Sequence, residues 1–160
     1  TIKLIIYENE ENGVYELASK LGIRMEQVLK SSFETADEYY NELQRVLQSE
    51  DVEYIFLLGY KHIIREPFLG SFENRIVNIH PSILPSFRGK RAIQQALEYG
   101  VKVTGITTHL IDADLDRGTI LCQRPIQIEK YETFEDLDLR FVEEGKLIIE
   151  DTFKEIGKNE

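Results

Sequence analysis

The first half of the chain alternates short apolar segments with amphipathic ones, and this alternation limits the folds available to it. Residues 2–7 and 52–58 are short and rich in β-branched and aliphatic side chains, as buried strands are. Residues 23–29 form a weaker strand pattern. Apolar residues recur at helical spacing over 14–21 and 36–47. Strands that alternate with helices pair in parallel, so this half predicts a parallel sheet covered by helices.

The second half has a different order of elements. A strand is expected at 75–79, and a helix over 92–97 follows it. Two strands at 103–111 and 120–128 then follow each other without a helix between them. Such neighbours are expected to pair antiparallel at the edge of the sheet. Thr133 is placed to cap a long last helix.

Together these patterns predict an α/β fold, a Rossmann-like doubly wound and mostly parallel sheet with an antiparallel edge. The length of 160 residues and a hydrophobic share of 42% suit one domain over 1–160 with a substantial core. A net charge of −10 argues against nucleic acid or an anionic membrane as the main partner. The single cysteine, Cys122, excludes an internal disulfide and fits a reducing cytoplasm.

The segment 77–85 begins as the end of a buried strand and turns into a loop. Asn78 and His80 are two residues apart, so their side chains leave the same face of that strand. Open α/β sheets bind ligands at such strand ends. Pro85 lies in a tight loop, where a cis peptide would be informative because cis bonds are nearly confined to proline. Taken alone, an Asn and a His at a strand end are more often ordinary hydrogen-bonded structure.

A second polar cluster, 109–118, joins the last two strands and carries Asp112, Asp114 and Asp116. Their spacing superficially resembles the start of a calcium loop. The loop glycine and the closing glutamate of an EF-hand are absent, so no metal is expected. Two interpretations remain, a solvated acidic turn and a site in which one aspartate faces His80.

An amide, an imidazole and a carboxylate can together carry out acyl chemistry. A nearby carboxylate favours the charged form of His80, and imidazolium with an amide N–H can stabilise an oxyanion. The chain has no Gly-x-Ser-x-Gly motif, and Cys122 has no evident base partner. The residues therefore indicate direct transfer between two substrates without a covalent enzyme intermediate.

The segments 78–85, 105–109 and 116–118 resemble the signatures of the folate-dependent formyltransferase family. Glycinamide ribonucleotide transformylases are the most similar members, and tRNA and sugar formyltransferases and formyltetrahydrofolate deformylases are relatives. The resemblance implies transfer of a formyl group from 10-formyltetrahydrofolate to a primary amine through a tetrahedral intermediate, in purine biosynthesis if the acceptor is glycinamide ribonucleotide.

Together with the tight loop, the resemblance predicts that the Leu84–Pro85 peptide is cis. It also implies roles for single residues. Asn78 and His80 would hold the formyl oxygen, Asp116 would set the charge of His80 and relay the proton, and His109 would support them. His62 stands where transformylases often carry arginine. The residues expected to contact the folate are Gly59, His62, Ile63, Ile64, Leu69, Asp112 and Asp114.

The chain departs from the transformylases on the acceptor side. Residues 8–13, with three glutamates, stand where a glycine-rich phosphate loop is expected. The loop after Gly89 carries Lys90 and Arg91, more like the tRNA and sugar enzymes. Arg88, Lys90 and Glu144 are expected on the acceptor side, although Glu144 is out of register with an expected Glu-His pair. The acceptor therefore stays open, as does the oligomeric state. Two alternatives are a hydrolase that uses water and a non-catalytic folate-binding relative.

Relative to the family, residues 2–22 resemble the second strand–helix unit, and the first unit is missing from this sequence. An unfilled place in a sheet would leave costly unpaired backbone groups. We therefore expect residues 2–7 to take the central place, between 23–29 and 52–58, in a flavodoxin-like order.

Overall fold

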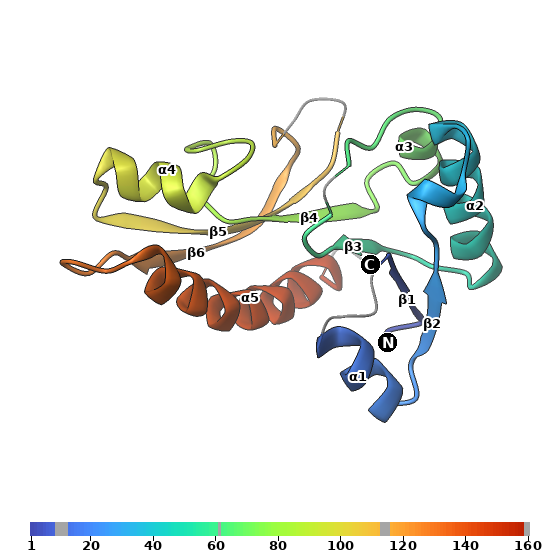
Figure 1. The fold of residues 1–160 in the computed structure, drawn as a ribbon, viewed down its shortest axis with the longest axis horizontal. Helices are drawn as coiled ribbons and strands as arrows, with labels where there is room; N and C mark the ends of the chain where they lie inside the picture. The colour runs from blue at the N-terminus through green and yellow to red at the C-terminus, as the bar shows by residue number, and fades with distance from the viewer. Residues whose placement is uncertain (9–12, 61, 113–115, 159–160) are drawn as a thin grey trace. The chain divides into compact units, whose positions relative to one another are not determined.

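The structure, a computed structural model, describes residues 1–8, 13–60, 62–112 and 116–158 (Figure 1). The chain forms two compact units, described separately below. Unit 1 comprises Thr1–Glu53 and Glu66–Ser71, and unit 2 comprises Tyr54–Arg65 and Phe72–Glu160.

Unit 1 contains a two-stranded parallel sheet and its helices. Strand β1 (Leu4–Tyr7) pairs with β2 (Arg24–Gln27), as the sequence predicts. The helical elements are α1 (Gly13–Lys20), the 3₁₀ turn η1 (Lys30–Ser32), α2 (Ala36–Ser49) and α3 (Phe68–Ser71).

Helix α2 contributes five buried residues to unit 1. The Thr35 hydroxyl accepts the Glu38 N–H while the Glu38 carboxylate accepts the Thr35 N–H, which satisfies two N-terminal donors. The Tyr40 ring packs on Phe68 of α3 with ring centroids 5.4 Å apart. The buried residues are those of the predicted apolar face: Tyr39, Tyr40, Leu43, Val46 and Leu47.

Helix α1 is present as predicted, but its apolar face is mostly not buried. Only Ala18 is buried, at 1% exposure, while Leu17 and Leu21 are 57% and 64% exposed. Val14 is also exposed, at 46%. Periodicity predicts the helix because it reflects the backbone repeat, but it does not say whether anything packs on the apolar side.

Unit 2 contains a four-stranded sheet in the order β3-β4-β5-β6. The β3–β4 pair is parallel, and the β4–β5 and β5–β6 pairs are antiparallel. This confirms the predicted antiparallel edge, where Pro125 of β6 lies opposite Gly105. The elements are β3 (Ile55–Leu57), β4 (Ile76–His80), α4 (Ala92–Tyr99), β5 (Val103–Leu110), β6 (Ile120–Gln127) and α5 (Phe134–Ile156).

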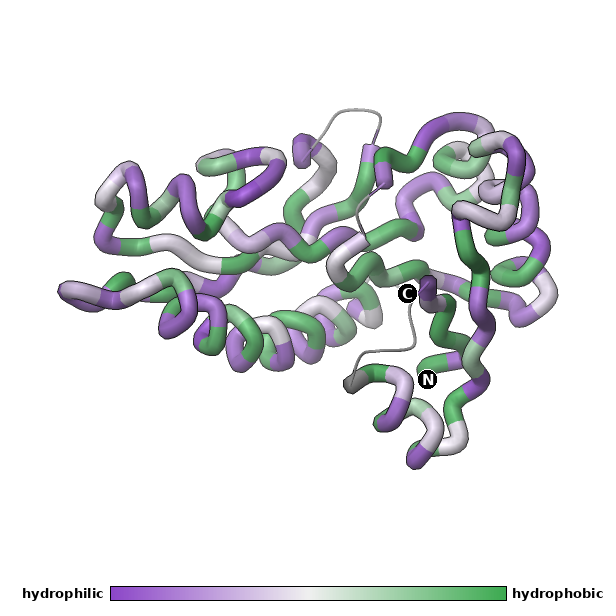
Figure 2. The backbone as a smooth tube through the Cα atoms, viewed as in Figure 1, coloured by the Kyte–Doolittle hydropathy of each residue, from purple (hydrophilic) through white to green (hydrophobic). Residues whose placement is uncertain are grey.

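The core of unit 2 lies where α5 runs along β5 and β6 (Figure 1). Figure 2 shows hydrophobic residues recurring along these elements. Thr133 caps α5 through a reciprocal bond pair with Asp136. Phe153 of α5 is 51% exposed, and its ring centroid lies 4.8 Å from that of Phe56. The central cluster consists of Ile93, Ile106, Ile126, Leu137, Phe141 and Ile148.

The expected pairing of residues 2–7 with 52–58 is not found among the hydrogen bonds of the described strands. Those strands form a two-stranded and a four-stranded sheet. Strand β3 is also shorter than expected, because only Ile55–Leu57 have strand geometry. None of the helices described is both long and apolar enough to cross a membrane.

Thr104 of β5 carries the one buried side-chain polar atom without a hydrogen-bond partner in the described part of the chain. The residue is 2% exposed. We expect Thr104→Val to raise the free energy of unfolding by about 1–3 kcal/mol, because a methyl group replaces an unsatisfied hydroxyl. Urea denaturation measures this change.

The matched control is Thr107→Val in the same strand. The Thr107 hydroxyl donates to the Ser82 carbonyl at 2.6 Å and accepts the Leu84 N–H at 3.1 Å, so the same exchange should destabilise the protein there. A loss of stability in both variants would contradict the expectation for Thr104.

Candidate active site

The polar cluster at the end of β4 is built on cross-strand register. Asn78 lies opposite His109 of β5. The Asn78 amide donates from Nδ2 to His109 Nε2 at 3.2 Å. His109 in turn donates from Nδ1 to the Leu110 carbonyl at 2.9 Å. Because a carbonyl oxygen only accepts hydrogen bonds, the second contact places a proton on Nδ1 of His109.

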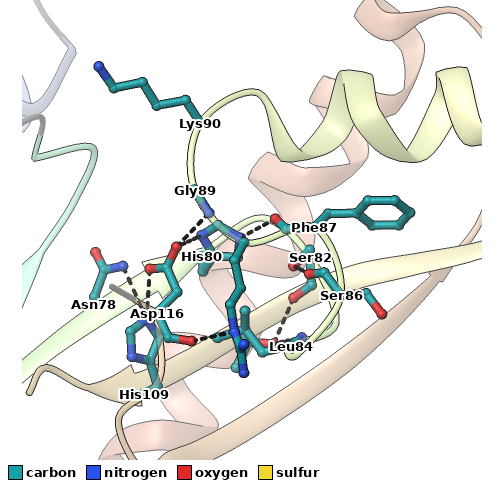
Figure 3. Close-up of polar contacts among 12 residues, drawn as sticks. Asn78, His80, Ser82, Leu84, Ser86, Phe87, Gly89, Lys90, His109 and Asp116 are labelled. Carbon is teal, nitrogen blue, oxygen red and sulfur yellow. Dashed lines mark hydrogen bonds and ion pairs between the residues drawn. The ribbon is translucent and has the colours of Figure 1, made fainter. Parts of the chain in front are cut away.

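His80 ends β4, and both of its ring nitrogens face oxygen atoms. Nε2 donates to the Phe87 carbonyl at 2.8 Å, and Nδ1 lies 3.4 Å from Oδ2 of Asp116 (Figure 3). The ring is 4% exposed. Because each nitrogen has an acceptor nearby, both N–H groups of an imidazolium would be satisfied here.

The loop after β4 folds back so that its backbone meets the His80 ring. The Leu84–Pro85 peptide is cis, as predicted. The Ser82 hydroxyl donates to the Ser86 carbonyl at 2.5 Å, and Gln123 of β6 donates to the Leu84 carbonyl at 2.9 Å. These bonds fix the loop through its own backbone and the neighbouring strands.

Asp116 completes the cluster from the segment between β5 and β6. Its Oδ2 accepts the Gly89 N–H at 2.8 Å, and its Oδ1 lies 3.6 Å from His109 Nε2. Its φ of +51° is left-handed, which is uncommon for a residue other than glycine. The predicted convergence is confirmed, because the Asp116 carboxylate lies 3.4 Å from His80 and His109 links Asn78 to the same carboxylate.

The surroundings of Asp116 favour its ionised form. The contact with the His109 imidazole lowers the pKa of Asp116 most, and burial acts in the opposite direction. The Gly89 N–H lowers it further, and positive charge on the His80 or His109 ring acts in the same direction. The net result is a pKa below the usual range of an aspartate.

The segment expected to bind folate follows β3. Gly59 is exposed with a left-handed φ of +69°, and its missing Cβ would meet no neighbour. Ile63 is 64% exposed, Ile64 is buried, and the His62 ring lies 5.4 Å from that of Tyr60. These residues belong to unit 2, as do Asn78 and His80.

Three other residues expected near the folate give a mixed result. Leu69 is buried in α3 of unit 1, so its part in this site stays a prediction. Asp112 is exposed at the end of β5. Asp114 lies outside the described residues.

The residues expected on the acceptor side are separated. Arg88 donates from Nε to the Asp116 carbonyl at 3.1 Å. Lys90 is exposed and extends away from the cluster (Figure 3). Arg91 donates to Gln94 at 2.6 Å and lies 3.5 Å from Glu98, along the surface of α4. Glu144 pairs with Arg124 at 2.6 Å. Among the described residues it forms no hydrogen bond or ion pair with the cluster, so its predicted role stays a prediction.

The turn over 8–13 is only partly described. Glu8 belongs to unit 1, where the Tyr39 hydroxyl lies 3.5 Å from its carboxylate. Glu10 and Glu11 lie outside the described residues. That glutamates stand at 8–13 in place of a phosphate-binding loop therefore stays a prediction from the sequence.

Two backbone groups of the site were missed by the sequence reasoning. The Phe87 carbonyl is a partner of His80, and the Gly89 N–H is a partner of Asp116. Gly89 has a φ of +80°, so a glycine after the proline loop could have indicated a left-handed turn. Phe87 also has a positive φ, of 51°, and nothing in its identity indicates that.

Comparisons with known proteins agree with this geometry. The family model described as "Formyl transferase" matches residues 1–152. The phosphoribosylglycinamide formyltransferase of Bacillus subtilis (strain 168) is 34% identical over 137 residues, which cover 86% of this chain and 70% of that protein. The human trifunctional purine biosynthetic protein adenosine-3 is 31% identical over 139 residues, which are 87% of this chain and only 14% of that protein. The crystal structure of phosphoribosylglycinamide formyltransferase from Bacillus halodurans has a TM-score of 0.92 and 32% identity, covering 100% of this chain and 83% of that one.

Proposed function

The chain belongs to the formyl transferase family, and on that premise we propose that it moves a formyl group from 10-formyltetrahydrofolate to a primary amine. The observation that carries the proposal is the convergence of Asn78, His80 and Asp116, with the carboxylate 3.4 Å from the imidazole. The amine attacks the formyl carbon directly, and the folate nitrogen leaves from the tetrahedral intermediate.

Each of the three side chains has a group suited to this reaction. Asn78 uses one amide hydrogen on His109, and its second hydrogen is available to the developing oxyanion. A protonated His80 adds positive charge beside that oxyanion. Asp116 is ionised and accepts hydrogen bonds, so it can take up the proton that the attacking amine releases and pass it toward the leaving nitrogen.

The segment after β3 suits the folate donor. Strands β3 and β4 are parallel, so the chain leaves β3 after Leu57 at the edge of the sheet where β4 ends with Asn78 and His80. Leu58 and Ile63 are exposed there and offer apolar surface to a planar ring. The donor brings the formyl group on its nitrogen, and this segment would hold and orient the ring.

The proposed acceptor rests on the similarity to phosphoribosylglycinamide formyltransferases and on the charged residues of this chain. The relatives are phosphoribosylglycinamide formyltransferases, so glycinamide ribonucleotide is the first acceptor to test. The sequence of residues 8–13 has three glutamates and would repel a phosphate ester. We therefore propose that an acceptor phosphate is held by Arg88 and Lys90, or that the acceptor is a neutral or cationic amine.

The deciding experiment is a screen of candidate amines with 10-formyltetrahydrofolate, in which the formation of tetrahydrofolate is measured. Turnover that depends on an added amine supports the proposal. Release of formate without any amine indicates a hydrolase, and folate binding without turnover indicates a non-catalytic binding protein. Efficient turnover of glycinamide ribonucleotide that is insensitive to Glu8→Gln and Glu10→Gln, with its phosphate seated on residues 8–13, would contradict the proposed place of the phosphate.

A further inference from the structure

Asp116 is held in its left-handed conformation by two consecutive residues of the loop after β4. Arg88 donates from Nε to the Asp116 main-chain carbonyl at 3.1 Å, and the Gly89 N–H donates to Oδ2 at 2.8 Å. A left-handed aspartate persists only where its surroundings over-determine it. The residues 88–89 therefore fix both the backbone and the carboxylate of Asp116.

Arg88 uses only part of its capacity in this contact. A guanidinium is a rigid plane with five N–H donors, of which the Asp116 carbonyl takes the one on Nε. No other hydrogen bond or ion pair of the Arg88 side chain is found among the described residues, and the residue is exposed. The two terminal nitrogens of Arg88 therefore remain available to a ligand. They lie in the same guanidinium plane as Nε.

We propose that Arg88 couples the binding of an anionic group of the acceptor to the position of Asp116. This inference rests on the proposed formyl transfer. An oxyanion with two oxygens, a phosphate or a carboxylate, can bind the terminal nitrogens of an arginine side by side. Because the guanidinium is rigid, an anion that fixes its outer edge also fixes Nε on the Asp116 carbonyl.

The coupling makes a thermodynamic demand that can be tested. If the anion binds Arg88 more tightly when Asp116 holds its observed position, then binding of the anion must stabilise that position of Asp116 by the same factor. Arg88 would act through Asp116 and would be a positioning residue, since it touches no reacting atom.

The kinetic test compares Arg88→Lys with Arg91→Lys. Both variants keep the charge, but lysine has a single ammonium group and cannot bridge an anion and the Asp116 carbonyl through one plane. With an acceptor that carries a phosphate, Arg88→Lys should lower kcat by about 10- to 100-fold, the scale of a misplaced catalytic group. Arg91, which contacts Gln94 and Glu98 on α4, should tolerate the same exchange with kcat and KM unchanged.

A second measurement needs no turnover and uses inorganic phosphate as the probe. The carboxyl ¹³C signal of Asp116 and the amide signal of Gly89 are followed by NMR as phosphate is added. In the parent protein and in Arg91→Lys, saturable shifts of both signals are expected. In Arg88→Lys, phosphate should no longer move them, although the groups that face Asp116, namely His80, His109 and Gly89, are unchanged.

The two measurements separate failure of this inference from failure of the proposed function. If no amine accepts the formyl group, the proposed function fails and the NMR titration still tests the coupling. If formyl transfer is present but Arg88→Lys matches Arg91→Lys in both measurements, the inference is wrong and the transferase proposal stands. Phosphate shifts that are equal in all three proteins, or absent from all three, would also overturn it.

Discussion

Asp116→Asn is expected to lower kcat by about 10²–10⁴-fold, the usual contribution of a positioned acid–base group. Asparagine has nearly the same shape, and its amide oxygen can still accept the Gly89 N–H that Asp116 accepts at 2.8 Å. It carries no charge opposite His80 and cannot take up a proton at neutral pH. Single-turnover kinetics and folate binding measured separately should show a large loss in the chemical step and a small change in affinity.

The matched control is Asp138→Asn, which removes an exposed carboxylate from α5 and should leave kcat unchanged. Equal losses of folate affinity and turnover in Asp116→Asn would instead assign Asp116 a structural role in its loop.

The parent protein and Asp116→Asn are also expected to differ in how their stability depends on pH. The pKa of Asp116 is lowered by folding, so its ionised form stabilises the folded state at pH values above the pKa of the unfolded chain. That contribution is lost as the pH falls through the lower pKa of the folded state. The difference in unfolding free energy between the parent protein and Asp116→Asn should therefore be constant near neutral pH and shrink below about pH 4.

The sequence predicts those parts of the structure that follow from a repeat or a short motif. The buried face of α2 follows from helical spacing, and the convergence of Asn78 and Asp116 on His80 follows from two motifs. The central place of His109, between Asn78 and Asp116, could not be predicted in this way. It depends on the β4–β5 register, which sets Asn78 opposite His109 and which no local pattern encodes.

Other features depend on the tertiary contacts of a residue, which its local sequence does not determine. Leu17 has the spacing of a buried residue but is 57% exposed, because periodicity does not supply a partner. Glu144 forms a 2.6 Å ion pair with Arg124 of β6, a partner that no local sequence pattern indicates. The Phe87 carbonyl reaches His80 only because Phe87 adopts a positive φ, and this depends on how the whole loop closes.

Gly118→Ala is expected to remove most of the activity by displacing a backbone group that supports the site. A Cβ at this position would overlap the carbonyl oxygen of Leu110 and lie 2.8 Å from its carbon, and neither atom can rotate away as a side chain could. That carbonyl accepts the His109 Nδ1–H at 2.9 Å. Moving it would release the His109 ring, which contacts both Asn78 and Asp116.

The expected result for Gly118→Ala is a loss of about 1–3 kcal/mol in unfolding free energy, as for other overpacked sites, together with a fall in kcat of about 10²-fold from misplaced catalytic groups. Urea denaturation and steady-state kinetics measure the two effects. Gly145→Ala is the matched control, because a Cβ there lies 3.8 Å from Ile106 in ordinary contact. Within α5 that exchange should stabilise the protein by about 0.5–1 kcal/mol, since alanine is the better helix former. Normal turnover in Gly118→Ala, with the His109 and Asp116 signals unshifted, would show that the turn absorbs the added methyl group without involving the site.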